Sequence, residues 1–257
     1  MAKLNLFWMS VFTIFSQCTQ SQSPQSKLPA KLPEKFNIRF YDGGGMLPQS
    51  DEIYISKDSC YLEYFYNQAR NKIYFSLTQE ELEQLYQVFV KNQFHKIKAD
   101  EEKEVYDRGG THLSLMIDNQ YIDKSDSGLS FIQANWKQAY GQCVSAVRQI
   151  ATQKTAALKK DIKIQLDSSI SESGHIVSLQ IADSQFNYYS EEQGIQTQMA
   201  VSLYPGQHSL GINLIGNTQP SYQRKNITSS FFIFEVKEST RGIKFSLKEN
   251  KIILEEF

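Results

Sequence analysis

The clearest pattern of apolar and polar positions in the chain lies in residues 77–94. Apolar side chains recur there at i, i+3, i+4 and i+7 between polar residues: Leu82, Leu85, Tyr86 and Phe89. This spacing predicts an amphipathic helix with one buried stripe. Thr78 and Glu81 have the spacing of a capping box, in which each side chain bonds the backbone N–H of the other residue. We therefore expect a helix that begins at Thr78 and covers a sheet.

A second helical pattern runs from Phe131 to about Leu158. Its apolar residues are spaced alternately by four and three: Trp136, Tyr140, Cys143, Val147 and Ile150. Lys159 and Lys160 follow, and their charge suits the negative C-terminal end of a helix dipole. The pattern predicts a second long helix that packs on the same sheet.

Strand patterns surround these two helices. Aromatic and β-branched residues at alternating positions predict strands at residues 36–41, 53–56, 60–66, 73–76, 111–117 and 120–124. The polar stretches Lys57-Asp58-Ser59 and Asp118-Asn119 separate neighbouring strands and predict hairpins. Residues 35–160 are therefore predicted to form an α+β domain, an antiparallel sheet with two packing helices.

Beyond Lys160 the pattern contains strands alone. Seven segments have strand character: 162–166, 176–181, 196–203, 208–214, 227–236, 243–247 and 252–254. Tyr204-Pro205-Gly206-Gln207 places Pro and Gly where a type II turn requires them. Seven short strands are typical of an immunoglobulin-like fold, so we expect an all-β sandwich domain over residues 161–257.

The chain opens with the composition of an export signal. Lys3 precedes an apolar run of about twelve residues, which is shorter than the ~20 that a membrane-spanning helix needs. The run ends in Phe15-Ser16-Gln17-Cys18, which resembles the lipobox of bacterial lipoproteins, where the cysteine is diacylated and becomes the mature N-terminus. The resemblance implies a signal sequence over residues 1–18 and a membrane anchor through lipid on Cys18. The alternative is an ordinary signal peptide in which Cys18 has no role.

Residues 19–34 are rich in Gln, Ser, Pro and Lys and are predicted to form a flexible tether. A lipoprotein needs such a spacer to hold its globular part clear of the lipid headgroups. In lipoproteins of the enteric type, Asp after the lipidated cysteine retains the protein at the inner membrane. Thr19 in that position implies the outer membrane of a Gram-negative bacterium, with the chain facing the periplasm or the cell surface.

Two further resemblances concern the folded part of the chain. The order of elements over residues 36–155, with the stretches LTQEELEQLYQVF and YDRGGTHLSLMI, resembles uncharacterised α+β domains of bacterial lipoproteins. The stretch VSLYPGQHSLGINL resembles the strand, turn and strand unit of periplasmic β-sandwich modules of the PEGA kind. These resemblances imply a fold and a compartment but no catalytic residue.

Composition and motifs exclude several functional classes. The 27 basic and 28 acidic residues leave no field that would steer nucleic acid to the chain. The histidines are scattered and have no metal-ligand spacing: His95, His112, His175 and His208. The acidic residues near Asp100 and Asp126 do not match a calcium-binding loop, and Gly43-Gly44-Gly45 fits a turn better than a phosphate loop. We expect no cofactor, no metal and no catalytic residue.

If Cys18 carries lipid, Cys60 and Cys143 remain. Two alternatives stay open for them, a disulfide in an oxidising compartment or two separate buried thiols. The sequence predicts a non-catalytic, membrane-anchored cell-envelope lipoprotein that acts as a protein-interaction or structural module, with another envelope protein or the cell wall as its partner. The alternative is a secreted ligand-binding or inhibitor protein, or a hydrolase with a dispersed active site.

Overall fold

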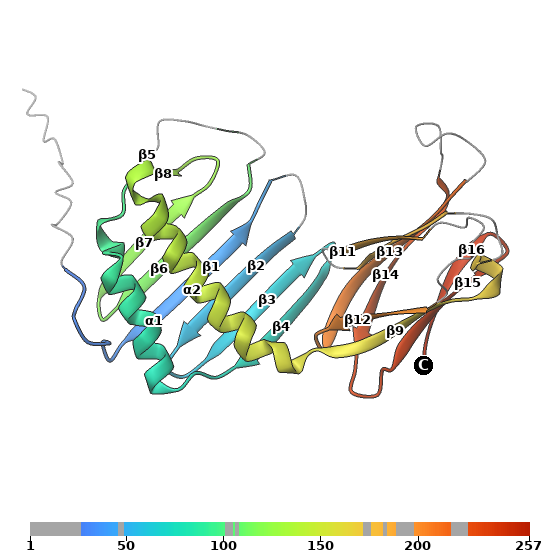
Figure 1. Cartoon of the computed structure of the whole chain (residues 1–257), viewed down its shortest axis with the longest axis horizontal. Coiled ribbons are helices and arrows are strands. Elements are labelled where there is room, and N and C mark those ends of the chain that lie inside the picture. The colour runs from blue at the N-terminus through green and yellow to red at the C-terminus, as the bar shows by residue number, and fades with distance from the viewer. Residues whose placement is uncertain are drawn as a thin grey trace, which may run out of the picture.

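The computed structural model describes residues 27–45, 49–100, 105, 108–171, 176–181, 184–188, 198–216 and 226–257. Within these ranges the protein is rich in β structure, with a six-stranded sheet, two four-stranded sheets and a short two-stranded pair (Figure 1). Two long helices accompany the six-stranded sheet. The chain is thus α+β with largely antiparallel sheets, as the pattern predicts.

The six-stranded sheet is antiparallel throughout and has the order β4-β3-β2-β1-β6-β7. Its strands are β1 (Phe36–Gly43), β2 (Gln49–Ser56), β3 (Cys60–Tyr66), β4 (Ala69–Phe75), β6 (Gly110–Ile117) and β7 (Gln120–Asp126). The hairpins predicted at residues 57–59 and 118–119 join β2 to β3 and β6 to β7. Both of these predictions are confirmed.

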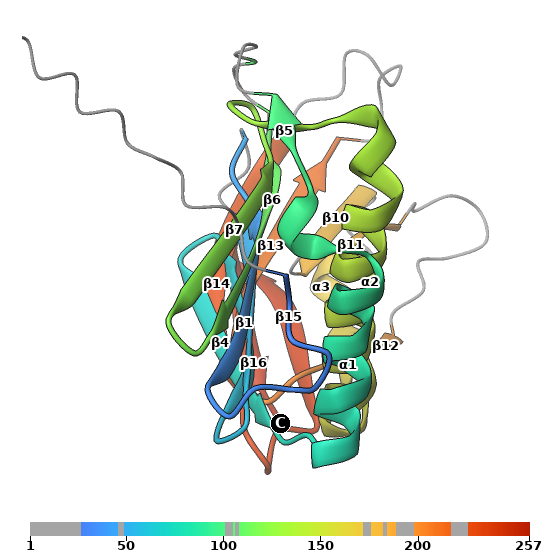
Figure 2. The ribbon, with the colours of Figure 1, turned by 90° about the vertical axis from the view of Figure 1, so that its left-hand side faces the viewer.

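The helices α1 (Gln79–Lys91) and α2 (Lys137–Thr155) pack on one face of this sheet, as Figure 2 shows. The predicted capping box starts α1: the Glu81 N–H donates to Thr78 Oγ1 over 3.2 Å, and the Thr78 N–H donates to Glu81 Oε2 over 2.9 Å. All four residues of the predicted stripe on α1 are buried. Lys154 Nζ of α2 lies 2.7 Å from Glu81 Oε1, which joins the two helices.

The second helix is shorter than the pattern predicts. The strand β8 (Phe131–Ile132) pairs with β5 (Ala99–Asp100), and a 3-10 turn at Ala134–Trp136 precedes α2. Its buried stripe consists of Tyr140, Cys143, Val147, Ala151 and Thr155. Ile150 packs against the core but is only partly buried, and the helical period of 3.6 residues continues the fully buried stripe onto Ala151 and Thr155.

The predicted tether over residues 19–34 extends too far toward the folded part. Leu28 is only 3% exposed and belongs to the core beneath α1. The Tyr86 hydroxyl donates to the Pro29 carbonyl over 2.8 Å, and Gln87 Nε2 donates to the Ala30 carbonyl over 2.8 Å. This segment therefore packs against the folded part through two apolar side chains, Leu28 and Leu32, and through two backbone carbonyls that accept hydrogen bonds from α1.

The C-terminal strands form two four-stranded sheets, with the orders β12-β9-β15-β16 and β11-β10-β13-β14. These strands are β9 (Lys160–Leu166), β10 (Ile176–Ile181), β11 (Ser184–Tyr188), β12 (Gln198–Leu203), β13 (Gly206–Ile215), β14 (Asn226–Val236), β15 (Gly242–Lys248) and β16 (Lys251–Glu256). β9 and β15 pair in parallel, and the other pairs are antiparallel. The described residues contain eight strands here rather than the predicted seven, because β11, SQFNY, has no aliphatic residue to mark it.

The described residues form two hydrophobic clusters. One lies between the six-stranded sheet and its two helices, and the other takes residues from both four-stranded sheets. We refer to residues 27–159 as the N-terminal unit and to residues 160–257 as the C-terminal unit. The helix α2 leads through a 3-10 turn at Ala156–Leu158 directly into β9, so a short link joins the two units (Figure 1).

Candidate functional site

The face of the six-stranded sheet opposite the helices carries a row of tyrosines. Tyr54, Tyr61 and Tyr74 are direct cross-strand partners in β2, β3 and β4. The rings of Tyr54 and Tyr61 stack with centroids 5.3 Å apart, and the Tyr74 ring meets Tyr61 edge-on at 6.2 Å. Tyr41 in β1 and Tyr121 in β7 lie on the same face. These five residues form what we call the tyrosine face.

Charged side chains between the rings pair with one another. The Arg39 guanidinium donates to both Glu52 carboxylate oxygens, over 3.1 and 2.9 Å, and the Tyr61 hydroxyl donates to Glu52 Oε1 over 2.7 Å. Lys72 Nζ lies 2.7 Å from Glu63 Oε2 and 4.0 Å from the centroid of the Tyr61 ring. The network holds the rings in place and leaves little net charge between them.

The ionisation of this network follows from its hydrogen bonds. Burial and the hydrogen bond to Glu52 raise the pKa of Tyr61 to about 12. Burial opposes ionisation of Glu52, but hydrogen bonds from Arg39 and Tyr61 outweigh it, and the pKa of Glu52 is lowered. The Arg39–Glu52 pair therefore stays charged at neutral pH, and Tyr61 stays a hydrogen-bond donor.

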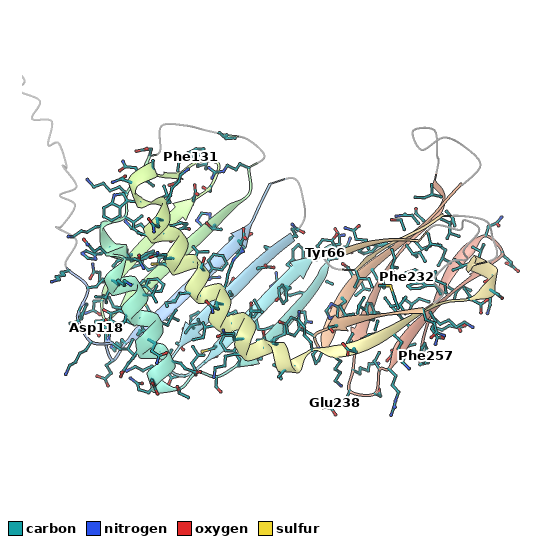
Figure 3. The ribbon with its side chains drawn as sticks, viewed as in Figure 1. Tyr66, Asp118, Phe131, Phe232, Glu238 and Phe257 are labelled. Carbon is teal, nitrogen blue, oxygen red and sulfur yellow. The ribbon has the colours of Figure 1, made fainter. Side chains whose placement is uncertain are left out.

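A cleft of about 670 Å³ lies between the N-terminal and C-terminal units. Four residues that pair across β1, β2, β3 and β4 contribute to its lining from the helix-side face of the sheet: Asp42, Asp51, Tyr64 and Asn71. The opposite side comes from β12 and from the start of β13. Tyr66 lies at the end of β3 where the two units meet (Figure 3). The cleft thus exists only when both units are assembled.

Polar and aromatic contacts close the junction beside the cleft. Asn71 Nδ2 donates to the Pro205 carbonyl over 2.8 Å, and the Tyr64 ring stacks on Tyr204 with centroids 5.7 Å apart. The Tyr204 hydroxyl lies 2.9 Å from Thr155 Oγ1 at the end of α2. One residue of the C-terminal unit, Tyr204, therefore contacts both the sheet and a helix of the N-terminal unit.

The protonation of His208 at the junction follows from its geometry. His208 Nε2 lies 2.7 Å from the Tyr204 carbonyl oxygen, which can only accept. The proton therefore sits on Nε2 and leaves Nδ1 as an acceptor. Burial lowers the pKa of His208, so the ring is neutral at neutral pH.

The turn that carries these contacts has no room for a larger residue. Gly206 has the positive φ, 112°, that the Pro-Gly turn predicts. A Cβ atom at Gly206 would lie 2.3 Å from Asn71 Oδ1. The turn joins β12 and β13, which belong to two different sheets. Gly206 therefore lies where the chain passes from one sheet to the other, next to the N-terminal unit.

Of the two alternatives for Cys60 and Cys143, a disulfide or two buried thiols, the structure has the two buried thiols. Cys60 and Cys143 are free and buried, as two separate thiols. The Cys60 thiol donates instead to the Ser56 carbonyl over 3.5 Å. Burial raises the pKa of both thiols, that of Cys143 to about 12. These cysteines pack the core, and their raised pKa values keep them as thiols rather than reactive thiolates at neutral pH.

The other sequence-predicted features do not converge on one site. His95 is buried near α1, His112 lies beside Tyr41 on the tyrosine face, and His208 is at the junction. Among the described residues, no group of three or more His, Cys, Asp or Glu could hold a metal ion. Cys18 and His175 lie outside the described residues. In the part that is described, no helix is long and apolar enough to cross a membrane.

No protein-family model matches the chain, and a search of curated proteins finds no relative. The function is therefore argued from the geometry of the surfaces described above. Alternating tyrosines in adjacent strand patterns are a signal from which the tyrosine face could have been found. The cleft has no such signal, because its lining residues, such as Asp42 and Tyr204, come from distant parts of the chain and lie together only in the tertiary structure.

Proposed function

We propose that this chain is a non-catalytic lipoprotein of the cell envelope, anchored through lipid on Cys18, that docks a protein partner on its tyrosine face. The observation that carries the proposal is the row of Tyr54, Tyr61 and Tyr74 on the open side of the sheet. Tyr74 and Tyr121, near opposite edges of this face, are 65% and 67% exposed. Large exposed apolar surfaces on a folded protein mark interaction sites.

The chemistry of the tyrosine face suits a protein partner. Tyrosine, arginine and methionine are enriched at the centres of protein interfaces, and Arg39 and the exposed Met116 accompany the rings. The internal ion pairs leave no excess of positive charge that would attract nucleic acid or anionic lipid. Stacking and hydrogen bonds already order Tyr54 and Tyr61, which lowers the entropy lost on binding.

The anchor sets where this partner is found. The lipobox-like end of residues 1–18 supports lipid attachment at Cys18, and Thr19 supports the outer membrane. Residues 19–26 lead from Cys18 to the described part, and a chain of that length reaches at most about 29 Å when fully extended. The tyrosine face is then held near the membrane, within reach of other envelope proteins.

The proposal also assigns each of the two units to a class of fold. In it, the C-terminal unit is an immunoglobulin-like β-sandwich of the PEGA kind, and the N-terminal unit is an α+β lipoprotein domain. A core shared by two four-stranded sheets supports the sandwich, since face-to-face sheets bury their inner side chains against one another. β9 and β15 pair in parallel, and this feature allows the C-terminal unit to be compared with known sandwiches.

The anchor is tested by the intact mass of the protein recovered from the membrane fraction. We expect a mature chain that begins at a lipid-modified Cys18, and a Cys18→Ala variant that loses both the lipid and the membrane association. An unmodified soluble chain cut at another position would contradict the anchor while leaving the tyrosine face to be tested separately.

The docking surface is tested by photo-crosslinking in intact cells. A photoreactive residue replaces Tyr74 or Tyr121 on the tyrosine face, and Glu83, exposed on α1, serves as the matched control. We expect one protein adduct of the same mass from both tyrosine positions, and none from Glu83. The Arg39→Glu change, which repels Glu52 and disorders the face, should reduce the adduct. Adducts with wall glycan, or equal adducts from Glu83, would contradict a protein partner on this face.

A further inference from the structure

The cleft between the two units has the dimensions of a small-molecule site. Its volume of about 670 Å³ lies inside the range of roughly 300 to 1,000 Å³ that is usual for ligand pockets. The tyrosine face lies on the opposite side of the six-stranded sheet, so the cleft is a separate feature. The junction of Asn71 with the turn at Pro205 holds its two sides together without filling it.

Two carboxylates and one ammonium line the cleft, and Arg148 next to it balances the second carboxylate. Asp42 forms an ion pair with Arg148 of α2, which also lies over the Phe40 ring. The other charged lining residues are Asp51 and Lys159, one of each sign, and His208 is neutral. The cleft therefore has no field that would select a phosphate, a carboxylate or a cation.

The polar groups of the cleft are hydroxyls and amides. They come from both units: Gln49, Ser50, Asn71, Ser202, Gln207 and Ser209. Ser209 is 1% exposed, and its hydroxyl has no hydrogen-bond partner among the described residues. A buried hydroxyl without a partner costs free energy that a bound polar group recovers. The need for a partner at Ser209 points to a ligand with hydroxyl groups of its own.

Aromatic rings supply the apolar part of the lining. Tyr64 and Tyr66 project from the same side of β3, two residues apart. Tyr64 is fixed by its stacking on Tyr204, and the Tyr66 hydroxyl accepts a hydrogen bond from Gln180. Rings held in this way offer flat apolar surfaces next to hydroxyl and amide groups. The C–H faces of a sugar ring pack on such surfaces, while its hydroxyls bond to the polar groups at the edge.

We infer that this cleft binds a neutral, hydroxyl-rich ligand of the class of mono- and disaccharides. Cancelled charges exclude a strongly ionic ligand, hydroxyl and amide groups match the ligand's hydroxyls, and Tyr64 and Tyr66 match its apolar ring faces. Because both units line the cleft, binding also stabilises their assembly.

The inference is tested by saturation-transfer NMR and calorimetry on the full chain in detergent. The probes are glucose, maltose and N-acetylglucosamine as neutral sugars, with glucosamine and glucuronate as charged comparators. We expect a neutral sugar to bind more tightly than either charged one. Ser209→Ala should weaken that binding about tenfold, the effect of one lost hydrogen bond. Ser246→Ala is the matched control, because Ser246 in β15 also has a buried unpaired hydroxyl but lies outside the cleft.

The outcomes separate this inference from the proposed docking function. Sugar binding that survives both Ser209→Ala and Tyr66→Ala would overturn the cleft as the site. Preferred binding of glucosamine or glucuronate would overturn the neutral class of ligand, and no binding of any sugar to correctly folded protein would overturn the inference altogether. Arg39→Glu should reduce docking on the tyrosine face and leave sugar binding unchanged, so either proposal can fail without the other.

Discussion

Single tyrosine side chains order the tyrosine face and the junction beside the cleft. Tyr61 takes part in four interactions at once: a stack on Tyr54, an edge-on contact with Tyr74, a hydrogen bond to Glu52 and a cation contact with Lys72. At the junction, Tyr204 has a similar role between Tyr64 and a lysine ammonium. In both places an aromatic ring with a hydroxyl joins apolar packing to a polar network, which explains the choice of tyrosine over phenylalanine.

The thiols of Cys60 and Cys143 give a first prediction at the residue scale. Both are buried with raised pKa values, so in the folded Cys18→Ala protein they should react with a thiol reagent only slowly. In denaturant, without reductant, both should react at once. Thiols that appear only after reductant is added would show that the two cysteines are bridged in the cell.

Two glycines give a second prediction with opposite signs. Gly206→Ala should destabilise the protein by about 1 to 3 kcal/mol, because φ is positive and a Cβ would collide with Asn71. Gly141→Ala in α2 is the control, since a Cβ there meets no atom within 4 Å. It should stabilise the protein by roughly 0.5 to 1 kcal/mol through helix propensity. Urea unfolding of the two variants measures both changes, and a neutral Gly206→Ala would refute the tight junction.

At the scale of elements, local pattern placed the helices well and their ends less well. α1 begins at its capping box because Thr78 and Glu81 carry all the information the start requires. The start of α2 was predicted six residues too early, because β8 pairs with β5 from a distant part of the chain. Leu28 was assigned to the tether for the same reason, since the residues around it in the sequence do not indicate that it packs into the core.

The cap of α1 gives a prediction at this scale. Thr78→Ala removes the acceptor for the Glu81 N–H and should cost about 1 kcal/mol in the free energy of unfolding. Ser76→Ala, at an exposed position two residues earlier, should change it by less than ~0.5 kcal/mol. Urea denaturation measures both, and equal effects would mean that the capping box does not stabilise the helix.

At the scale of the whole molecule, the junction brings the two units into contact. Asn71, Tyr64 and Thr155 of the N-terminal unit all contact the segment from Tyr204 to His208. These contacts are polar or aromatic, and neutral His208 lies among them beside Asn71 and the Tyr204 carbonyl. The assembly of the units, and with it the cleft, should therefore respond to acid.

The pH dependence of stability follows from His208. Its folded-state pKa is lowered, so the unfolded chain binds the proton more readily than the folded chain. The contribution to stability is complete above the ordinary histidine pKa of about 6.5 and is lost as pH falls below it toward the lowered folded value, by at most about 1.4 kcal/mol per pH unit. Urea unfolding at a series of pH values measures this slope. His208→Gln should reduce the slope of the free energy of unfolding with pH. Burial also lowers the pKa of His95, so the contribution of His95 to the slope should remain. An unchanged slope in His208→Gln would contradict the role of His208.

The sequence by itself determined most of the helices and strands and the faces that they bury. The stripe on α1, the hairpins around residues 57–59 and 118–119, and the positive φ at Gly206 follow from spacing and residue type within a few positions. Periods of 3.6 and 2 residues, caps and turn residues act locally, so the linear chain already contains them.

The tertiary structure alone decided which distant residues meet. The row of Tyr54, Tyr61 and Tyr74 depends on the register of three strands, and the cleft depends on a turn more than a hundred residues away from Asn71. The free state of Cys60 and Cys143 was also beyond the sequence, which allowed a bridge as readily as two thiols. Register and the docking of the two units minimise the free energy of the whole chain, and no local pattern encodes a sum over contacts so far apart.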